Sequence, residues 1–176
     1  FLEMNTRIQV EHPVTEMISG IDLIAEQIKV SCGEKLSYKQ EDISLRGWSM
    51  EARINAEKIS TEIYPSSGTV SHVKLASGPF VRCDTHIYSS YSVPSDYDSL
   101  LVKLIVWGQN REQARSRMLR ALKELELEGI DTNQSLHQAV LLHPQFKTAQ
   151  FHTQFLEENW QELIEPLELK CFSSLD

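Results

Sequence analysis

The sequence predicts an α+β fold, in which helices come first, a run of strands follows, and helices return at the end. Residues 48–55 alternate apolar with polar side chains, which is typical of a half-buried strand. Residues 111–127 repeat apolar side chains at helical spacing (Ala114, Met118, Ala121, Leu122 and Leu125), which predicts a helix with one buried face. Strands and helices are segregated along the chain, so a doubly wound parallel sheet is not expected.

The N-terminal part is expected to hold one strand and two short helices. Residues 1–11 alternate like a strand that runs into a loop, and Pro13 ends it because proline restricts itself and the residue before it. Helices are predicted over residues 14–19 and 22–32, with Asp22 at the start of the second and a glycine after its end. Residues 34–46 are polar and charged, which predicts a surface connection between two parts of the chain.

The middle of the chain is expected to form the sheet. A turn at residues 65–68 (Pro-Ser-Ser-Gly) precedes predicted strands over 69–75 and 80–85. Residues 100–107 are apolar except for Lys103, which indicates either one buried strand or a short helix followed by a strand.

Helices are expected again towards the C-terminus. The helix over 111–127 is predicted to end at Gly129, and a second over 133–142 to stop at a His-Pro pair. A further helix is expected over 153–160, and the last dozen residues are expected to fray.

Composition excludes several classes of function. The formal net charge of −8 argues against a nucleic-acid or membrane-surface partner, and no apolar run reaches the roughly 20 residues of a membrane span. The three cysteines are odd in number and widely spaced, which favours a reducing, cytoplasmic setting over a disulfide framework. The six histidines do not cluster at metal-ligand spacing, so they are expected to be structural or surface residues.

The first eleven residues carry the strongest candidate site. Their odd positions are polar: Glu3, Asn5, Arg7, Gln9 and Glu11. Carboxylate and amide oxygens suit Mg²⁺, a guanidinium can grip a small anion with two hydrogen bonds, and a second carboxylate can act as a base. An ideal strand of this length spans about 26 Å, so the chain must bend if all five groups serve one centre. The pattern therefore indicates a metal- and anion-binding site, against the simpler alternative of a solvated strand face.

The exact residues narrow this interpretation. The run Glu-Met-Asn-Thr-Arg-Ile-Gln-Val-Glu-His-Pro-Val-Thr-Glu at 3–16 closely resembles the active-site segment of biotin carboxylases, members of the ATP-grasp superfamily. Further stretches, in order, resemble the C-terminal domain of that family: 51–57, 78–88, 97–105 and 129–133. The resemblance covers roughly residues 1–160. It implies the end of an ATP-grasp domain over 1–44, a C-terminal domain with an antiparallel sheet flanked by helices over 45–152, and a C-terminal helix and tail over 153–176.

The resemblance also implies an activity and partners. In this family ATP and bicarbonate give carboxyphosphate, whose CO₂ carboxylates biotin on a carrier protein, the first half-reaction of acetyl-CoA carboxylase in fatty acid synthesis. Biotin carboxyl carrier protein, a carboxyltransferase and a second copy in a homodimer are the implied partners, and Mg²⁺ or Mn²⁺ the implied metal. The final acyl-CoA or keto-acid acceptor stays open, as does whether the parent is a separate subunit.

The resemblance also implies a role for each residue that matches a functional position of the family. Glu3 and Asn5 match metal ligands, and Arg7 matches the catalytic arginine that grips bicarbonate. Gln9 and the backbone N–H of Val10 match groups that line the anion pocket.

Two further residues match catalytic groups. Glu11 matches the general base, and Arg82 a second arginine that holds bicarbonate and stabilises the biotin enolate. Glu51 and Arg53 share a strand face and are expected to pair structurally, and Asp98 and Lys103 are also expected to be structural. Phe80 departs from the family's Gly-rich turn before the arginine.

Two other functions remain open at this point. Another bicarbonate-activating ATP-grasp ligase, such as a carbamoyl-phosphate synthetase, would share part of the pattern, and a non-catalytic interaction module is the alternative from a different class. The chain has no Gly-rich loop to close over phosphates, and the family's nucleotide-binding residues would lie before Phe1. The chain by itself is therefore expected to be inactive.

Overall fold

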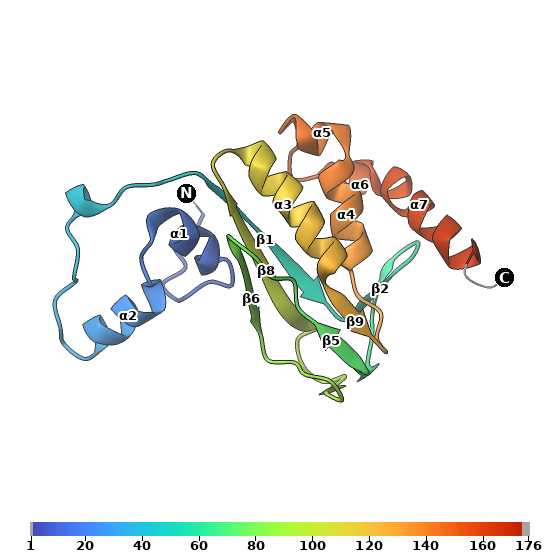
Figure 1. The fold of residues 1–176 in the computed structure, drawn as a ribbon, viewed down its shortest axis with the longest axis horizontal. Coiled ribbons are helices and arrows are strands. Elements are labelled where there is room, and N and C mark those ends of the chain that lie inside the picture. Colours follow the sequence, from blue (N-terminus) through green and yellow to red (C-terminus); the bar gives the residue numbers. More distant parts are fainter. Residues whose placement is uncertain (1, 174–176) are drawn as a thin grey trace.

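The centre of the molecule is a three-stranded antiparallel sheet with the strand order β1-β8-β6. The computed structural model describes residues 2–173. The strands are β1 (Trp48–Asn55), β6 (Val81–Thr85) and β8 (Leu100–Gly108), and β8 pairs with both of the others (Figure 1). Residues 100–108 therefore form one continuous strand, which settles the choice left open by the sequence.

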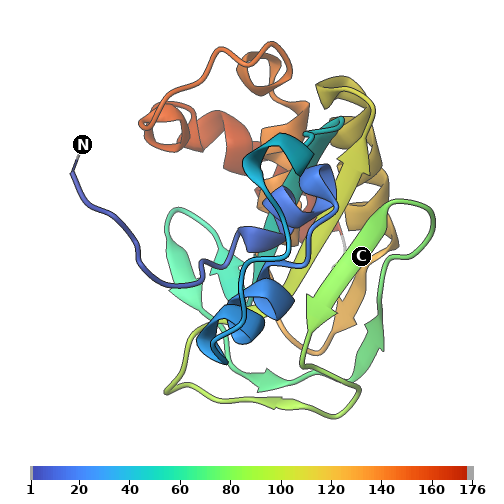
Figure 2. The same cartoon turned by 90° about the vertical axis from the view of Figure 1, so that its left-hand side faces the viewer.

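The two faces of the sheet are covered by different helices. Leu104 and its apolar neighbours on β8 pack in the main core with residues of α3 (Arg111–Glu124), and α4 (Gln134–Leu142) lies beside α3. The short helix α1 (His12–Ser19) packs on the other face, against β1 and β8. Figure 2 shows α1 in front of the sheet and the C-terminal helices behind it. Because neighbouring residues of a strand point to opposite faces, β8 presents Leu104 to the core on one side and Lys103, beside the buried Ile105, on the other.

The N-terminal helices have clear local causes. Pro13 occupies the first turn of α1, where its missing N–H is not needed, and Gly20 ends the helix in the left-handed conformation with φ +74°. The carboxylate of Asp22 accepts a hydrogen bond of 2.8 Å from the N–H of Ala25 and so caps α2 (Leu23–Ser31). The predicted connection 34–46 contains one 3₁₀ turn, η1 (Gln40–Asp42).

Three pairs of very short strands surround the central sheet. They were not all predicted, because two or three residues are too few to show an alternating pattern. They are β2 (Glu57–Ile59) with β3 (Ile63–Pro65), β4 (Gly68–Thr69) with β7 (Ser92–Val93), and β5 (His72–Lys74) with β9 (Glu126–Glu128).

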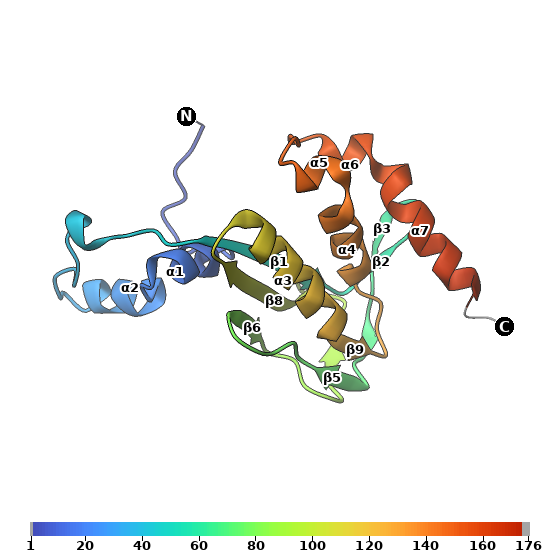
Figure 3. The same ribbon diagram turned by 45° about the horizontal axis from the view of Figure 1, so that its top comes forward.

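The C-terminal part is helical. After α4 come α5 (Pro144–Lys147), α6 (Phe155–Glu158) and α7 (Trp160–Ser173), and Leu136, Phe155 and Leu163 form a second apolar cluster. The indole N–H of Trp160 donates a hydrogen bond of 2.9 Å to the carbonyl of Thr61, between β2 and β3, which lie beside α7 in Figure 3. No helix within residues 2–173 is both long and apolar enough to cross a membrane.

The strand predicted over residues 1–11 is wrong for the part that the structure describes. Residues 2–9 carry no regular secondary structure, and Figure 2 shows them leading away from the sheet. Leu2 and Met4, two of the apolar residues in the alternating pattern, are exposed. A strand needs a neighbour for its backbone N–H and C=O groups, and none of the described strands pairs with this segment.

Three other boundaries differ from the predictions. Helix α3 ends at Glu124 rather than 127, because residues 126–128 pair with β5, and Gly129 at φ +87° follows that strand instead of the helix. The strand predicted over 69–75 is split between β4 and β5, which have different partners. The last dozen residues are not frayed as far as they are described, since α7 continues to Ser173.

Candidate active site

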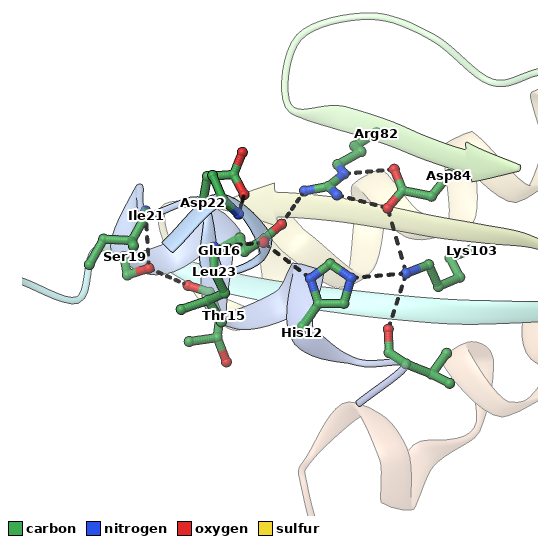
Figure 4. Close-up of polar contacts among 12 residues, drawn as sticks. His12, Thr15, Glu16, Ser19, Ile21, Asp22, Leu23, Arg82, Asp84 and Lys103 are labelled. Carbon is green, nitrogen blue, oxygen red and sulfur yellow. Dashed lines mark hydrogen bonds and ion pairs between the residues drawn. The ribbon is translucent and has the colours of Figure 1, made fainter. Parts of the chain in front are cut away.

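A layer of charged side chains lies between α1 and the central sheet. The register pairs Arg53 of β1 with Lys103 of β8, and Lys103 with Asp84 of β6, so that the three side chains share one face. Figure 4 shows His12 and Glu16 of α1 reaching toward this face. We call the following set the polar layer: Glu11, His12, Glu16, Glu51, Arg53, Arg82, Asp84 and Lys103.

Arg82 joins β6 to α1 through the polar layer. Its Nε and Nη2 donate to the two carboxylate oxygens of Asp84 at 2.7 and 2.8 Å, and its Nη1 donates to Glu16 at 2.6 Å (Figure 4). Burial is the largest single effect and opposes the ionisation of both carboxyls, but several opposing contacts together outweigh it and hold the pKa of Glu16 and of Asp84 below their usual values. These contacts come from Arg82 at both carboxyls, from His12 and the N–H of Leu23 at Glu16, and from Lys103 at Asp84. The bonds to Asp84 and Glu16 in turn raise the pKa of Arg82, against the effect of its burial. Because Arg82 binds Asp84 with two hydrogen bonds and Glu16 with a third, it connects β6 rigidly to α1.

Glu11 and Arg53 form an ion pair at the mouth of a cavity. The Nη2 of Arg53 donates to the Glu11 carboxylate at 2.7 Å, and both side chains are about half exposed, 48% for Arg53 and 53% for Glu11. The cavity has a volume of about 480 Å³, and its wall includes both side chains together with His137 and the apolar Met118 and Phe146. The pair is therefore within reach of a small solute.

The backbone beneath Arg53 is held firmly. Its carbonyl lies 2.8 Å from Nε2 of His137 and accepts a second hydrogen bond, of 3.2 Å, from the side-chain amide of Asn133. Asn133 is buried and also accepts from the N–H of Asn55 at 3.0 Å. Helix α4 and the residue before it thus fix the strand position from which Arg53 extends.

Glu51 is a buried carboxyl next to this ion pair. Its side chain is only 4% exposed, its Oε1 lies 3.7 Å from Nε of Arg53, and within residues 2–173 neither oxygen accepts a hydrogen bond. Burial raises the pKa of Glu51, and the nearby carboxylates of Glu11 and Asp84 add to the rise, while Lys103 and Arg53 oppose it.

The raised pKa predicts a pH-dependent effect of Glu51→Gln on stability. A carboxyl whose pKa is higher in the folded state than in the unfolded state favours folding at low pH, and this advantage is lost as the pH rises through the folded pKa. Glu51→Gln should therefore increase the free energy of unfolding relative to wild type near neutral pH, and the gain should vanish in acid. Urea unfolding of both proteins across that pH range measures it.

Glu16→Gln is the matched control with the opposite sign. The pKa of Glu16 is lowered, so its stabilising effect is present near neutral pH and is lost as the pH falls through the folded pKa. Glu16→Gln should destabilise the protein near neutral pH, with a smaller loss in acid. A gain from Glu51→Gln that does not change with pH would contradict the account of Glu51.

The structure brings together only some of the residues predicted for the site. Arg7 is exposed, and its guanidinium donates to the neighbouring carbonyl of Ile8 at 3.2 Å. Glu3 and Asn5 are also exposed, whereas Gln9 and Val10 are half-buried where the segment reaches α1. Within residues 2–173, no hydrogen bond or ion pair joins Glu3, Asn5 or Arg7 to Glu11.

Arg82 and Glu11 are not in contact within residues 2–173. In the described part of the chain Arg82 makes its polar side-chain contacts with Glu16 and Asp84, and the arginine that touches Glu11 is Arg53. The reason lies in the sheet order: Arg82 is on β6, the strand at one edge, and Arg53 is on β1 at the other edge.

Arg53 and Lys103 both lie close to the site, and the sequence did not lead us to expect this. Both were assigned to structural pairing. Lys103 was visible as the one charge in an otherwise apolar run, and a charge in the middle of a central strand needs a partner. That signal could have identified it, whereas nothing local distinguishes Arg53.

Fold and site together define an α+β domain in which a guanidinium–carboxylate pair lines a cavity. The family model described as biotin carboxylase C-terminal domain matches residues 51–158, more than half of the chain. A second family model, described as carbamoyl-phosphate synthase L chain, ATP binding domain, matches residues 1–39. The chain belongs to the biotin carboxylase family.

Known proteins similar to this chain support that assignment. The chloroplastic biotin carboxylase of Arabidopsis thaliana is 51% identical over 99% of this chain and 33% of its own length. Biotin carboxylase 1 of Bacillus subtilis is 50% identical over 89% of this chain and 35% of its own length. The chain thus spans about a third of the curated relatives it matches.

A solved structure has the same fold. The biotin carboxylase domain dimer of Hydrogenobacter thermophilus 2-oxoglutarate carboxylase, in complex with MgADP, ADP and bicarbonate, has a TM-score of 0.90 and 42% sequence identity. The match covers 93% of this chain and 36% of that one. The predicted α+β fold, with an antiparallel sheet flanked by helices, is confirmed.

Proposed function

We propose that the whole protein is an ATP-dependent biotin carboxylase that forms carboxyphosphate from ATP and bicarbonate and carboxylates biotin on a carrier protein. The observation that carries the proposal is the ion pair of Glu11 and Arg53 at an open cavity. The identity of about 50% to biotin carboxylases supports it, as does the similar domain solved with MgADP and bicarbonate.

The ion pair suggests how bicarbonate is bound and deprotonated. A planar anion can replace the Glu11 carboxylate on the guanidinium of Arg53, because both offer two oxygens to a fork of N–H donors. Glu11 is then released next to the anion that has displaced it, where it can accept the bicarbonate proton. Arg53 stays in place because its backbone is held by Asn133 and His137.

The remaining predicted residues fit roles around this pair. Arg7 is the second guanidinium for the anion, and Gln9 and the N–H of Val10 complete the pocket. We place Arg53, rather than Arg82, next to the bicarbonate and the biotin enolate oxygen, since Arg82 is occupied by two carboxylates. Arg82 then contributes by holding α1, and with it Glu11, on the sheet.

Glu3 and Asn5 can supply part of the ligand set of a divalent cation. Both are exposed, and within residues 2–173 neither side chain has a hydrogen-bond partner. Mg²⁺ commonly takes one or two protein oxygens and completes its shell with waters and substrate phosphates, and Mn²⁺ accepts similar ligands. When bound, such an ion neutralises phosphate charge during phosphoryl transfer.

The proposal extends to domains, partners and compartment. We infer a division into residues 1–44, 45–152 and 153–176, with the middle part as the family's C-terminal domain. Biotin carboxyl carrier protein, a carboxyltransferase and a homodimer partner follow from the proposed activity, and the solved relative is itself described as a dimer. The thiols of Cys32 and Cys83 are free, which supports a reducing compartment, the cytoplasm or, as the names of the plant relatives suggest, the chloroplast.

The test is ATP hydrolysis by the whole protein with bicarbonate and biotin each supplied or withheld. The proposal expects ATP cleavage that needs bicarbonate and a carboxylated biotin product. Absence of bicarbonate-dependent cleavage would refute it.

A carbamoyl-phosphate synthase-like ligase is the second candidate, because the family model that matches residues 1–39 carries that description. Cleavage that needs bicarbonate but makes no carboxybiotin would favour this candidate.

A further inference from the structure

Lys103 is the residue of the polar layer that connects the central strand directly to the segment before α1. Its Nζ lies 3.3 Å from the carbonyl oxygen of Val10, 3.4 Å from Nε2 of His12 and 3.6 Å from the carboxylate of Asp84 (Figure 4). We propose that Lys103 is a positioning residue that fixes the peptide between Val10 and Glu11, and through it the Glu11 carboxylate. This inference rests on the proposed function only where it concerns the role of Glu11 as the base.

The strand that carries Lys103, β8, is rigidly held. β8 has hydrogen-bonded neighbours on both sides, and Leu104 and Val106, on its opposite face, are fully buried. The Lys103 side chain is only 16% exposed, and Asp84 holds its ammonium group from the next strand. A side chain that is largely buried and bonded on two sides has lost most of its rotamer freedom, so it can fix the atoms that it contacts relative to the sheet.

The segment that Lys103 contacts, residues 9–11, has few other hydrogen bonds that fix its backbone. The N–H of His12 donates to the carbonyl of Gln9, and the N–H of Val14 donates to the carbonyl of Glu11, both within the segment itself. Glu11 precedes α1 without a side-chain capping bond. Within residues 2–173, the bond from Lys103 is the one hydrogen bond that joins the Val10 backbone to the sheet.

The chemistry explains why this contact matters for Glu11. The Val10 carbonyl belongs to the same planar peptide as the Glu11 nitrogen, so holding that oxygen fixes the plane from which the Glu11 side chain starts. Arg53 holds the other end, the carboxylate, at 2.7 Å. When an anion replaces Glu11 on Arg53, Arg82 still holds α1 through Glu16, and Lys103 is the contact that still holds the peptide of Glu11 itself near the reacting proton.

The test compares Lys103→Met with Lys74→Met in the whole protein. Lys74 also pairs with a carboxylate, Glu126, on the sheet β5-β9, so the control loses a lysine ion pair away from the polar layer. Amide hydrogen exchange in residues 9–16 should be faster in Lys103→Met and unchanged in Lys74→Met. The kcat for bicarbonate-dependent ATP cleavage should fall about 10- to 100-fold, the range expected for a misplaced catalytic group, while the KM for ATP stays near wild type.

Two further variants keep the test decisive if Lys103→Met folds poorly. Lys103→Arg keeps the charge and the donors and should restore most of the protection and the kcat, whereas Lys103→Gln stays polar but is too short to reach Val10. The inference is overturned if Lys103→Met and Lys103→Gln match Lys74→Met in exchange and kcat, even when their melting temperature is lower. A wild-type protein without bicarbonate-dependent ATP cleavage would instead refute the proposed function, and the exchange experiment would still decide whether Lys103 holds the segment.

Discussion

Arg53→Met should reduce bicarbonate-dependent ATP cleavage by the whole protein about 10²- to 10³-fold, the usual cost of removing one fixed donor from a reacting anion. Methionine keeps an unbranched apolar stem but is shorter than arginine and has neither charge nor N–H groups, so bicarbonate loses its paired contact and Glu11 loses its partner. The loss should appear mainly in kcat/KM for bicarbonate, and steady-state kinetics with bicarbonate and ATP varied separately measures it.

Arg120→Met is the matched control for Arg53→Met. Arg120 is similarly exposed and pairs with Glu124 one turn along α3, an exposed helical pair of the kind that contributes little to stability. Its kinetics should stay near wild type. Wild-type kcat/KM for bicarbonate in Arg53→Met would contradict the role given to Arg53.

Arg82→Met separates the roles of the two arginines. It leaves the largely buried Glu16 and the partly exposed Asp84 without their shared partner, so its first effect should be a lower melting temperature. A full loss of bicarbonate dependence in Arg82→Met at unchanged melting temperature, with Arg53→Met active, would restore the assignment made from the sequence.

The elements that the sequence predicted well are those with a long and regular pattern. β1 was predicted at its full length, because eight alternating residues show clearly which side chains are buried. The extent of β8 was also recognised, but its unbroken apolar run left open a short helix followed by a strand. The cap at Asp22 is a local signal and was also found where expected. The pairs β4-β7 and β5-β9 could not be predicted, since their pairing depends on segments that meet only in the folded chain.

The candidate site was predicted in its residue types but not in its geometry. Residues 3–11 stood out because carboxylates, amides and a guanidinium alternate within one short segment. The partner of Glu11 could not be chosen between two arginines, because both lie in stretches that resemble the family and the choice depends on strand order. Arg53 and Arg82 lie on opposite edges of the sheet, and only the position of α1 decides which arginine meets which carboxylate.

Leu104→Ala should lower the free energy of unfolding by about 2–5 kcal/mol, the range measured for such truncations in packed cores. Leu104 is fully buried in the main core, on the central strand, with Met118 and Leu122 of α3 in the same cluster. Its neighbour Lys103 points to the opposite face, so the cavity forms away from the polar layer. Urea unfolding measures the change, and it should be cooperative with an unchanged slope.

Leu142→Ala provides the control, because Leu142 is half exposed at the end of α4 and its truncation should change stability by no more than about 0.5 kcal/mol. If β8 holds the two faces together as described, Leu104→Ala lowers the stability of the protein yet leaves the kcat of the folded fraction near wild type, whereas Lys103→Met lowers the kcat of the folded fraction. Equal losses from Leu104→Ala and Leu142→Ala would mean that the face of β8 toward α3 is not the core of this fold.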